Sequence, residues 1–491
     1  MNTPDYYQGL MLIDGQLVES ESGQWLESLN PADEQPIGRV PLATAADMNR
    51  AVAAAERAQP AWARLPIADR AASLRRLADA IDADAPALAR LEARDTGNTV
   101  GTMLNDVKGA AERLRYAAGL GGELKGQTIP AVPGSLHLTM RVPYGVIGRI
   151  VAFNHPFGFA ATRIGPALIA GNALVLKPSE QSPLSAARLA ELCAATLPPG
   201  VVSIVTGARE TGEALVRHPR VKRIGLIGSV QAGMAVQRAA AETAIKHVTL
   251  ELGGKNPLVA FADADLDRVA KAAVDGMNFA WQGQSCGSTS RVLLHADIHD
   301  AVVERIVARV RALRLGDPLD PQTTMGPINS RAQFERVLAY IEAGRAQGAR
   351  LATGGNRPRG AAFERGYWVE PTVFTEVDMS MRIAREEIFG PVLSVLRFRT
   401  EQEAIDMAND TDYGLTAAVW TRDIDRALRV AQRIEAGFVW VNGVGSHYRG
   451  VPYGGLKNSG VGREESLEEI LDCTEEKVIN ILVAPESGAA A

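Results

Sequence analysis

Two short segments of the sequence carry a carboxylate and a thiol in settings suited to covalent catalysis. Glu251 opens the motif Glu-Leu-Gly-Gly-Lys directly after an apolar run, so we expect it to leave a strand at a glycine turn. Cys286 lies in Gly-Gln-Ser-Cys-Gly, after a predicted helix. A thiolate can attack a carbonyl carbon, and a carboxylate can then activate water. Taken alone, each residue also fits a plainer role, as a buried structural cysteine or a solvated strand end.

A third candidate is Asn154, which follows a predicted strand and precedes His155 and Pro156. The proline favours an extended turn at this point. The amide of Asn154 could therefore face the thiol and stabilise an oxyanion, or it could simply close an Asx turn at the strand end.

The segment Lys177-Pro178-Ser179-Glu180 follows the next predicted strand. In a doubly wound sheet, an acidic residue at a strand end can hold ribose hydroxyls and repels a 2′-phosphate, although a solvated turn is equally consistent. Gly228 and Ser229 end a later strand and could open a helix toward a phosphate. Gly212 follows another strand, but the sequence there does not form GxGxxG.

Composition narrows the class of protein. A chain of 491 residues is too long for one core, so two or more domains are expected. The formal net charge of -5, without a basic block, gives no indication of nucleic-acid or membrane binding. The 3 cysteines are too few and too scattered for a disulfide framework or a metal site, which favours a reducing cytoplasmic setting. The apolar region 142–176 is interrupted by charged residues and is expected to be core, not a membrane span.

The elements that must position these residues alternate between strand and helix. Thr44 and Asp47 resemble a capping box, and a helix after Pro66 is expected to end at Gly97. Short apolar runs predict strands at 146–153, 173–176, 201–205, 224–227, 248–250, 292–294, 392–398, 417–420 and 438–441. This alternation indicates parallel βαβ units in two α/β lobes, with the thiol loop near their junction.

Two further strands are predicted outside this pattern. Residues 136–142 alternate between apolar and polar, and residues 478–483 form an apolar run near the C-terminus. An apolar strand needs a partner, so we expect the two to pair with each other, with a neighbouring subunit, or both. The tail from Glu486 is expected to be disordered.

Six segments, given in chain order, resemble the NAD(P)-dependent aldehyde dehydrogenase superfamily over nearly the whole chain: the N-x-P turn, KPSE, ELGGK, GQSC, EIFGPV and GGLKNSGVGRE. The resemblance implies an α/β fold of two Rossmann-like three-layer α/β/α domains plus a small β oligomerisation element. The implied boundaries are 1–120 with 144–254 for the NAD-binding domain, 255–455 for the catalytic domain, and 121–143 with 470–491 for oligomerisation and bridging strands and tail.

The resemblance also implies a mechanism. Cys286 would form a thiohemiacetal with the aldehyde, and Asn154 and the Cys286 backbone N–H would bind its oxyanion. Hydride transfer to the nicotinamide would leave a thioester, which Glu251 would help to hydrolyse to the carboxylic acid. Glu464 matches a position proposed to relay protons. No metal is implied.

Residues implied to contact the cofactor are Ile150, Val151, Phe153, Lys177, Ser179, Glu180, Gly212, Gly228, Ser229, Leu252, Glu387 and Phe389. Glu180 favours NAD, and use of NADP stays open. Residues expected to contact the substrate are His155, Phe159, Trp281, Ser285, His447 and Tyr448.

The sequence departs from the common family pattern at three positions. Phe153 stands where Trp is frequent, His155 where Phe or Tyr is usual, and Ile227 where Thr is frequent. We hypothesise that His155, His447 and Tyr448, with Phe157 and Phe159, form a partly polar aromatic channel suited to an aromatic or polar-tailed aldehyde. Arg449 could bind a substrate carboxylate or lie at the surface.

Three alternatives compete with this function. One is a non-catalytic structural homologue, which the joint presence of Cys286, Glu251 and Asn154 disfavours. A CoA-acylating aldehyde dehydrogenase would pass the thioester to CoA, but such enzymes typically lack the deacylating glutamate that Glu251 supplies. A cysteine thioesterase or esterase would use Cys286 without redox chemistry. The sequence leaves open the physiological aldehyde and the choice between homodimer and homotetramer.

Overall fold

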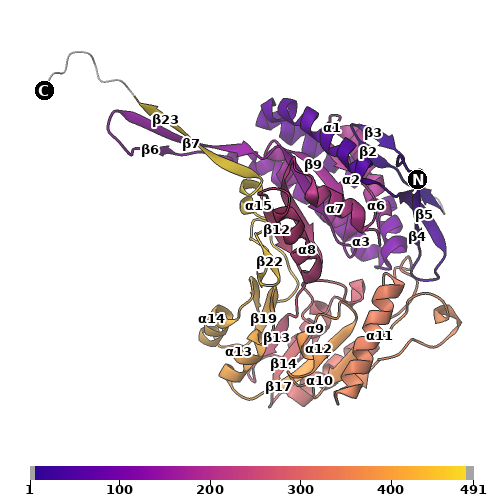
Figure 1. The fold of residues 1–491 in the computed structure, drawn as a ribbon. Coiled ribbons are helices and arrows are strands. Elements are labelled where there is room, and N and C mark those ends of the chain that lie inside the picture. The colour runs from indigo at the N-terminus through magenta and orange to yellow at the C-terminus, as the bar shows by residue number, and fades with distance from the viewer. Residues whose placement is uncertain (1–5, 483–491) are drawn as a thin grey trace.

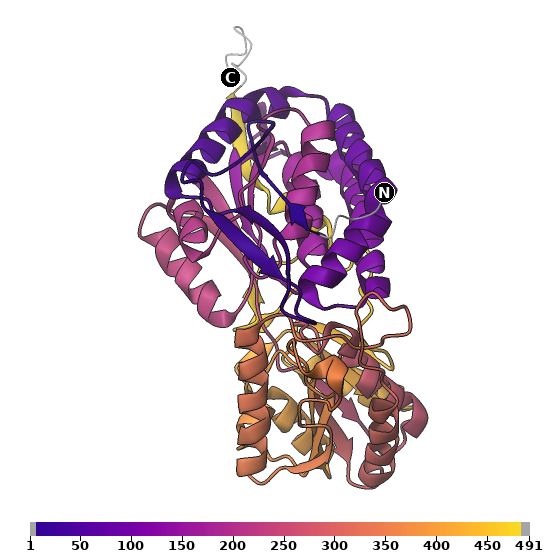
Figure 2. The ribbon, with the colours of Figure 1, turned by 90° about the vertical axis from the view of Figure 1, so that its right-hand side faces the viewer.

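Alternating strands and helices build two lobes, each a sheet with helices on both faces (Figure 1). The computed structural model describes residues 6–482. The predicted tail from Glu486 and the last residue of the predicted terminal strand, Val483, lie outside the described residues. In Figure 2 the lobe of the first sheet, coloured indigo to magenta, lies above the lobe of the second sheet, coloured mainly orange. The predicted α/β fold is confirmed.

The first sheet has eight strands, and its central five are parallel. In spatial order the strands are β22 (Gly460–Val461), β12 (His247–Glu251), β11 (Val221–Ile227), β8 (Val146–Ile150), β9 (Ala173–Lys177), β10 (Val202–Ile204), β2 (Met11–Ile13) and β3 (Gln16–Val18). The predicted strand at 146–153 ends at Ile150, so Phe153 lies in the loop that follows.

Helices cover this sheet on both faces because its strands are apolar on both. One face packs against α2 (Ile67–Thr96), α3 (Val100–Gly119), α4 (Pro156–Thr162), α5 (Ile164–Ile169) and α6 (Leu184–Thr196). The other packs against α1 (Ala45–Arg64), α7 (Arg209–Arg217) and α8 (Val230–Ala241). The predicted capping box of Thr44 and Asp47 is present at the start of α1, and Gly97 ends α2 with a φ of 82°.

The order of strands creates a crevice at the carboxyl ends of the sheet. The chain runs from β8 through β9 to β10 on one side, and then returns to place β11 and β12 on the other side of β8. Ligands of doubly wound sheets bind at such a reversal. The short strand β22 returns to this sheet near the end of the chain and pairs antiparallel with β12, with Gly460 opposite Glu251. This pairing therefore fixes the strand end that carries Glu251.

The second sheet has seven strands, parallel except for its edge strand β15. In spatial order they are β15 (Arg350–Thr353), β16 (Thr372–Thr375), β17 (Val392–Phe398), β14 (Arg291–His295), β13 (Pro257–Ala260), β19 (Thr416–Trp420) and β20 (Phe438–Val441). Its helices are α9 (Leu266–Gly276) and α10 (His299–Arg311) on one face, and α11 (Arg331–Ala346), α12 (Arg382–Arg385), α13 (Glu401–Asn409) and α14 (Ile424–Arg433) on the other.

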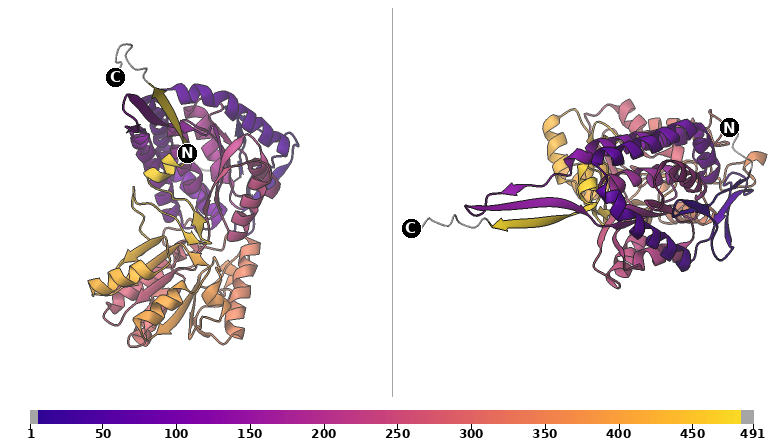
Figure 3. Two further views of the ribbon diagram at one scale, coloured as in Figure 1. Left: turned by 60° about the vertical axis from the view of Figure 1, so that its left-hand side comes forward. Right: turned by 90° about the horizontal axis from the view of Figure 1, so that it is seen from above.

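A β-arm projects from the first lobe (Figure 3). It consists of β6 (Thr128–Ile129), β7 (Ser135–Pro143) and β23 (Thr474–Leu482). β7 and β23 pair antiparallel along their whole length, from Thr474 opposite Pro143 to Leu482 opposite Ser135. The predicted pairing of these two strands is confirmed. The remaining elements are the sheet of β1 (Tyr7–Gln8), β5 (Pro36–Pro41) and β4 (Trp25–Leu29), the pair β18 (Tyr413–Gly414) with β21 (Leu456–Lys457), and helix α15 (Leu467–Leu471).

Candidate active site

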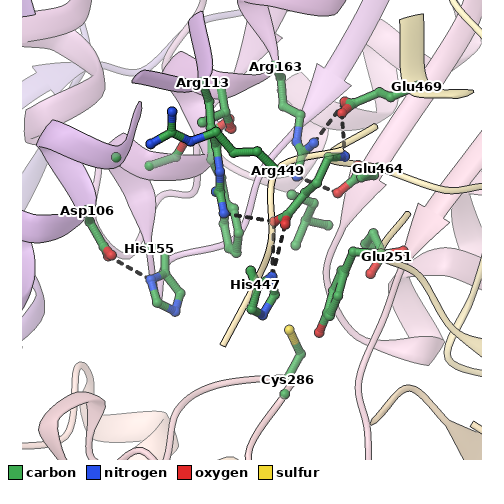
Figure 4. Close-up of a pocket in the computed structure, with 18 of the residues that line it drawn as sticks. Asp106, Arg113, His155, Arg163, Glu251, Cys286, His447, Arg449, Glu464 and Glu469 are labelled. Carbon is green, nitrogen blue, oxygen red and sulfur yellow. Dashed lines mark hydrogen bonds and ion pairs between the residues drawn. The ribbon is translucent and has the colours of Figure 1, made fainter. Parts of the chain in front are cut away.

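A cavity of about 440 Å³ brings the predicted thiol and carboxylate together. Cys286 and Glu251 both line it, although 35 positions separate them in the sequence and they come from different lobes. Glu464, from the loop that follows β22, lines the same cavity. Figure 4 shows the Cys286 sulfur and the Glu251 carboxylate on one side of this space, with His155 and Asp106 across from them.

Hydrogen bonds from the Asn256 side chain fix the loop that carries Cys286. After α9, residues Gln282 and Gly283 adopt positive φ values of 53° and 67°, which turns the chain sharply before the cysteine. The side-chain amide of Asn256 donates hydrogen bonds to the carbonyl oxygens of Cys286 at 2.7 Å and Ser288 at 2.9 Å. The loop is therefore irregular in shape but fixed in position.

The surroundings of Cys286 oppose its ionisation. Burial raises the pKa of its thiol to about 12, and the nearby carboxylates of Glu251 and Glu387 act in the same direction. Hydrogen bonding to the sulfur acts in the opposite direction and lowers the pKa, but burial outweighs it. A neighbouring base is thus needed to take the thiol proton at neutral pH.

Glu251 has the properties of such a base. It ends β12, is 6% exposed, and neither of its carboxylate oxygens has a hydrogen-bond partner among the described residues. Burial, and next the charge of Glu464, raise its pKa well above the ordinary value. A Cβ on Gly454 would lie 3.0 Å from a Glu251 carboxylate oxygen, so the glycine keeps the backbone close to the carboxylate. A buried carboxylate without partners readily accepts a proton.

Glu464 lies in a buried cluster of ion pairs beside Glu251. Arg149 approaches Glu464 at 3.4 Å and Glu469 at 3.3 Å, and Arg163 approaches Glu469 at 2.8 Å. Arg163 also pairs with Glu464. The predicted proton relay at Glu464 would therefore have to work from a carboxylate that two guanidinium groups already hold.

The turn after β8 holds Asn154 and His155 in different surroundings. Asn154 is 4% exposed, its backbone carbonyl accepts a hydrogen bond of 2.9 Å from the Asn98 side chain, and it is not among the residues that line the cavity within the described part of the chain. His155 does line the cavity, and its Nδ1 lies 2.7 Å from an Asp106 carboxylate oxygen. Its ring packs against Phe159 and Trp281, with centroids 5.3 and 5.2 Å apart.

Most predicted substrate contacts gather at this cavity. His155, Phe159, Trp281, Ser285 and His447 line it. Tyr448 does not line the cavity and is 55% exposed, because the backbone N–H of Val451 closes a turn onto the Tyr448 carbonyl at the surface. Phe157 is fully buried in the core of the first lobe and does not reach the cavity either.

Apart from Glu251, Glu464 and Arg449, the charged residues of the cavity wall were not predicted. Arg449 lines the cavity and forms an ion pair with Glu112. Glu465 accepts from His447 at 3.1 Å and from Arg113 at 3.0 Å. Burial opposes the charge on Glu465, but these partners outweigh it and lower its pKa to about 2. Asp106, Glu112 and Arg113 lie on α3, whose sequence shows only amphipathic helix spacing, and no motif distinguishes them.

The predicted cofactor contacts lie along the carboxyl ends of the first sheet and the facing loop of the second lobe. Lys177 donates to Glu180 at 2.7 Å, and this ion pair outweighs burial and lowers the pKa of Glu180. Ser229 is the exposed N-cap of α8, where it accepts from the Ala232 backbone N–H. The strand ends of β8 and β9 and the loops after them carry Ile150, Val151 and Ser179, and those of β11 and β12 carry Gly228 and Leu252. Gly212 lies on α7, and a Cβ built on it would come within 4.0 Å of Ile150 and Lys177.

Glu387 approaches this region from the second lobe. Its Oε1 accepts a hydrogen bond of 2.8 Å from the Gly254 backbone N–H, and burial raises its pKa to about 7. A Cβ on Gly253 would lie 2.0 Å from the other Glu387 oxygen, which explains the glycine at that position. Phe389 packs edge-on against Phe153, with ring centroids 5.6 Å apart. The carboxylates of Glu180 and Glu387 thus lie on either side of the N-terminus of α8. This arrangement suits a ligand that carries an anionic group between two pairs of hydroxyl groups.

The described residues include neither a membrane-spanning helix nor a cluster of metal ligands. None of their helices is both long and apolar enough to cross a membrane. They also contain no group of three or more His, Cys, Asp or Glu side chains that could hold a metal ion.

Comparisons with known proteins agree with this site. The family model described as the aldehyde dehydrogenase family matches residues 17–479. An aldehyde dehydrogenase of Talaromyces stipitatus, tropH, is 47% identical over 478 residues, covering 96% of this chain and 93% of that protein. The crystal structure of a putative aldehyde dehydrogenase from Burkholderia cenocepacia superposes with a TM-score of 0.95 at 43% identity, covering 99% of both chains. The NAD+ complex of an aldehyde dehydrogenase from Bacillus cereus gives a TM-score of 0.94 at 39% identity, covering 97% of both chains.

Proposed function

The chain belongs to the aldehyde dehydrogenase family, and from this premise we propose that Cys286 and Glu251, with bound NAD, convert an aldehyde to its carboxylic acid. The family membership makes the protein an oxidoreductase that acts on a small-molecule aldehyde. The observation that carries the proposal is the cavity shared by the Cys286 thiol and the unpartnered Glu251 carboxylate.

The first step is addition of sulfur to the carbonyl. Glu251 takes the thiol proton, the Cys286 sulfur forms a bond to the aldehyde carbon, and the carbonyl π electrons move to oxygen. The resulting oxyanion needs hydrogen-bond donors, and we assign the Cys286 backbone N–H and the Asn154 side-chain amide to this role. The bond from Asn98 to the Asn154 backbone carbonyl supports the assignment, because it fixes the turn from which that amide extends.

The cofactor contacts described above fit NAD. When bound, NAD supplies the acceptor for the hydride that leaves the aldehyde carbon. Lys177 and Glu180 would hold the adenosine ribose, the N-terminus of α8 at Ser229 would face the pyrophosphate, and Glu387 with Phe389 would hold the nicotinamide ribose and ring. Glu180 disfavours the additional phosphate of NADP, since two negative charges would meet there.

The last step releases the acid from Cys286. Glu251 first releases to solvent the proton that it took from the thiol. It then removes a proton from water, the hydroxide oxygen adds to the thioester carbon, and the carbon–sulfur bond breaks with its electron pair on Cys286. The raised pKa of Glu251 suits this role, because a carboxylate that holds protons more tightly is a stronger base. This step separates the proposal from a CoA-acylating enzyme, in which CoA would take the place of water.

The cavity wall supports an aromatic or polar-tailed aldehyde as substrate. Rings of His155, Phe159 and Trp281 form one wall, and the ion pairs of Arg449 and Glu465 form the polar wall. Rings bind flat apolar groups, and the charged groups bind a polar tail. Arg449 is already paired with Glu112, which argues against a dedicated carboxylate receptor at this residue.

The assay that tests the proposed function is an aldehyde panel with NAD and NADP, with and without CoA. We expect reduction of NAD, release of free carboxylic acid without CoA, and faster turnover of aromatic aldehydes than of short aliphatic ones. Release of an acyl-CoA only, or hydrolysis of esters without NAD reduction, would contradict the proposal. Equal rates for aromatic and aliphatic aldehydes would contradict the substrate class alone.

We propose further that the chain works in the cytoplasm as a homodimer or homotetramer assembled through the β-arm. Apolar side chains remain exposed along β7 and β23, among them Met140 at 42% and Val478 at 54%. Such an edge favours association with another chain. Light scattering after size-exclusion chromatography, on the full chain and on Val478→Glu, tests the assembly: the variant should shift toward smaller species.

A further inference from the structure

Tyr453 places a phenol beside the nucleophile, and none of the roles above uses it. The residue is 6% exposed and lines the same cavity as Cys286. Its ring packs against both Phe438 and His447, with centroids 5.5 and 4.4 Å away. Its backbone forms a two-way bridge with Glu464, donating at 2.9 Å and accepting at 2.8 Å. Both the ring and the backbone of Tyr453 are therefore fixed.

The hydroxyl of this fixed ring points at the Cys286 segment. A Cβ built on Gly287, the residue after the nucleophile, would lie 3.4 Å from the Tyr453 Oη. This is an ordinary van der Waals distance, so the phenol packs against the loop that carries the nucleophile. From this position the hydroxyl can donate a hydrogen bond to the Cys286 sulfur, which lies in the same cavity.

We propose that Tyr453 is a catalytic residue, whose hydroxyl donates a hydrogen bond that stabilises the thiolate of Cys286 before it attacks the aldehyde. The inference rests on the proposed function only in taking Cys286 as the nucleophile. The phenol keeps its proton throughout, and the thiol proton passes to Glu251. No bond to Tyr453 forms or breaks.

The electrostatics of the site explain why such a donor matters. Glu251 and Glu387 both place negative charge near the sulfur, and burial removes the water that would solvate a thiolate. A hydrogen bond to a charged acceptor is about twice as strong as one between neutral groups. The Tyr453 hydroxyl therefore stabilises the reactive thiolate more than the resting thiol, which makes its effect specific to activation.

The cavity contains a second phenol that serves as a control. Tyr116 on α3 also lines the cavity, but its hydroxyl lies next to Gly450, 2.9 Å from a Cβ built there. If any cavity phenol altered the reactivity of Cys286 by bulk polarity, Tyr116→Phe and Tyr453→Phe would act alike. The proposal requires that only Tyr453→Phe acts.

The test measures the thiol itself and needs neither aldehyde nor NAD. Full-length wild type, Tyr453→Phe and Tyr116→Phe are treated with iodoacetamide across a pH series, and alkylation of the Cys286 peptide is followed by mass spectrometry. Below the midpoint of the alkylation profile, we expect the rate of alkylation at each pH to fall about tenfold in Tyr453→Phe, which corresponds to a shift of about one pH unit, and to stay unchanged in Tyr116→Phe. In turnover, kcat/KM for the aldehyde should fall about tenfold in Tyr453→Phe with KM for NAD unchanged.

Other outcomes are decisive as well. An unshifted alkylation profile in folded Tyr453→Phe, with or without a loss of turnover, would overturn the inference, because the hydroxyl would then act on substrate or on nothing. Phenylalanine keeps the packing against Phe438 and His447, and thermal unfolding verifies that the variant is folded. If Cys286→Ala retained aldehyde oxidation, the proposed function would fail, whereas the alkylation profiles would still decide the role of Tyr453.

Discussion

The side-chain amide of Asn256 donates a hydrogen bond of 2.7 Å to the backbone carbonyl of Cys286. This carbonyl shares a peptide plane with the N–H of Gly287, which favours the thiolate and lowers the pKa of Cys286. Asn256 immediately precedes β13 and is 2% exposed. Its Oδ1 accepts a hydrogen bond of 3.0 Å from the Thr416 backbone N–H. The core of the second lobe thus sets the orientation of the peptide that contacts the nucleophile.

The first prediction concerns the loss of the hydrogen bonds from the Asn256 side chain. Asn256→Ala should lower the thermal midpoint and reduce kcat at least tenfold, because the buried carbonyls of Cys286 and Ser288 would lose their donor at a cost of about 1–3 kcal/mol each. Calorimetry and steady-state kinetics measure both effects. Asn356→Ala, on an exposed loop, is the matched control and should change neither. An Asn256→Ala variant with wild-type kcat would show that the loop does not depend on this amide.

The second prediction concerns hydrolysis. Glu251→Gln keeps the size of the side chain but removes the base, so steady-state turnover should fall by about 10²- to 10⁴-fold. The variant should also gain stability at neutral pH, because a neutral amide replaces a buried carboxylate without partners. Steady-state rates and urea unfolding test the two effects. Wild-type turnover in this variant would exclude Glu251 as the base.

The third prediction follows from Glu92 on α2. Its Oε1 accepts from the Phe157 N–H at 2.6 Å and from Ser185 at 3.0 Å, and burial raises its pKa from 4.5 to about 8. Between these two values the folded state holds a proton that the unfolded state has released, so stability falls as the pH rises through this window, by roughly 1 kcal/mol per pH unit from this group. Glu92→Gln should flatten the dependence of the urea midpoint on pH.

The control for this prediction is Glu335→Gln, at an exposed site on α11. It should leave the pH dependence of the urea midpoint unchanged. If Glu92→Gln also left the slope between pH 4.5 and 8 unchanged, the proton on Glu92 in the folded state would be excluded.

The fourth prediction concerns cofactor choice. Glu180→Ala should raise kcat/KM for NADP by about tenfold and lower it for NAD, because the repulsive carboxylate is lost and Lys177 is released to attract a phosphate. Initial rates with each cofactor at a fixed aldehyde concentration give the ratio. An unchanged preference for NAD would place the adenosine ribose away from Glu180.

The regular parts of the fold could be predicted because their signals are local. β17 has the predicted bounds, Val392–Phe398, and α2 ends where Gly97 predicts. β13 was missed, since Pro257–Ala260 is short and follows directly on the Gly-Gly turn. The two-residue strand β22 was also missed, because a segment of this length has no periodicity and forms only through its pairing with β12.

The same difference between local signals and long-range contacts decides which site residues could be predicted. Cys286 and Glu251 were predicted from motif chemistry, and the structure brings them to one cavity. The partners of the substrate wall could not be predicted, because contacts such as that between His155 and Asp106 join segments 49 positions apart. Tyr448 was expected at the substrate, but its neighbour Arg449 lines the cavity and Tyr448 itself turns to the surface. Sequence order identifies the loop and does not determine which of its side chains faces inward.

The central claim is that the substrate becomes covalently attached to Cys286 as a thioester that Glu251 helps to hydrolyse. The most direct test mixes Glu251→Gln with an aromatic aldehyde and NAD, quenches the reaction in acid, and maps the adduct by peptide mass spectrometry. Glutamine cannot take the thiol proton either, so we expect the acyl group to form slowly. It should still accumulate to one per peptide that contains Cys286, with an amount of reduced NAD equal to the number of active sites. Reduction of NAD without any adduct on Cys286, or with an adduct on another residue, would contradict the central claim.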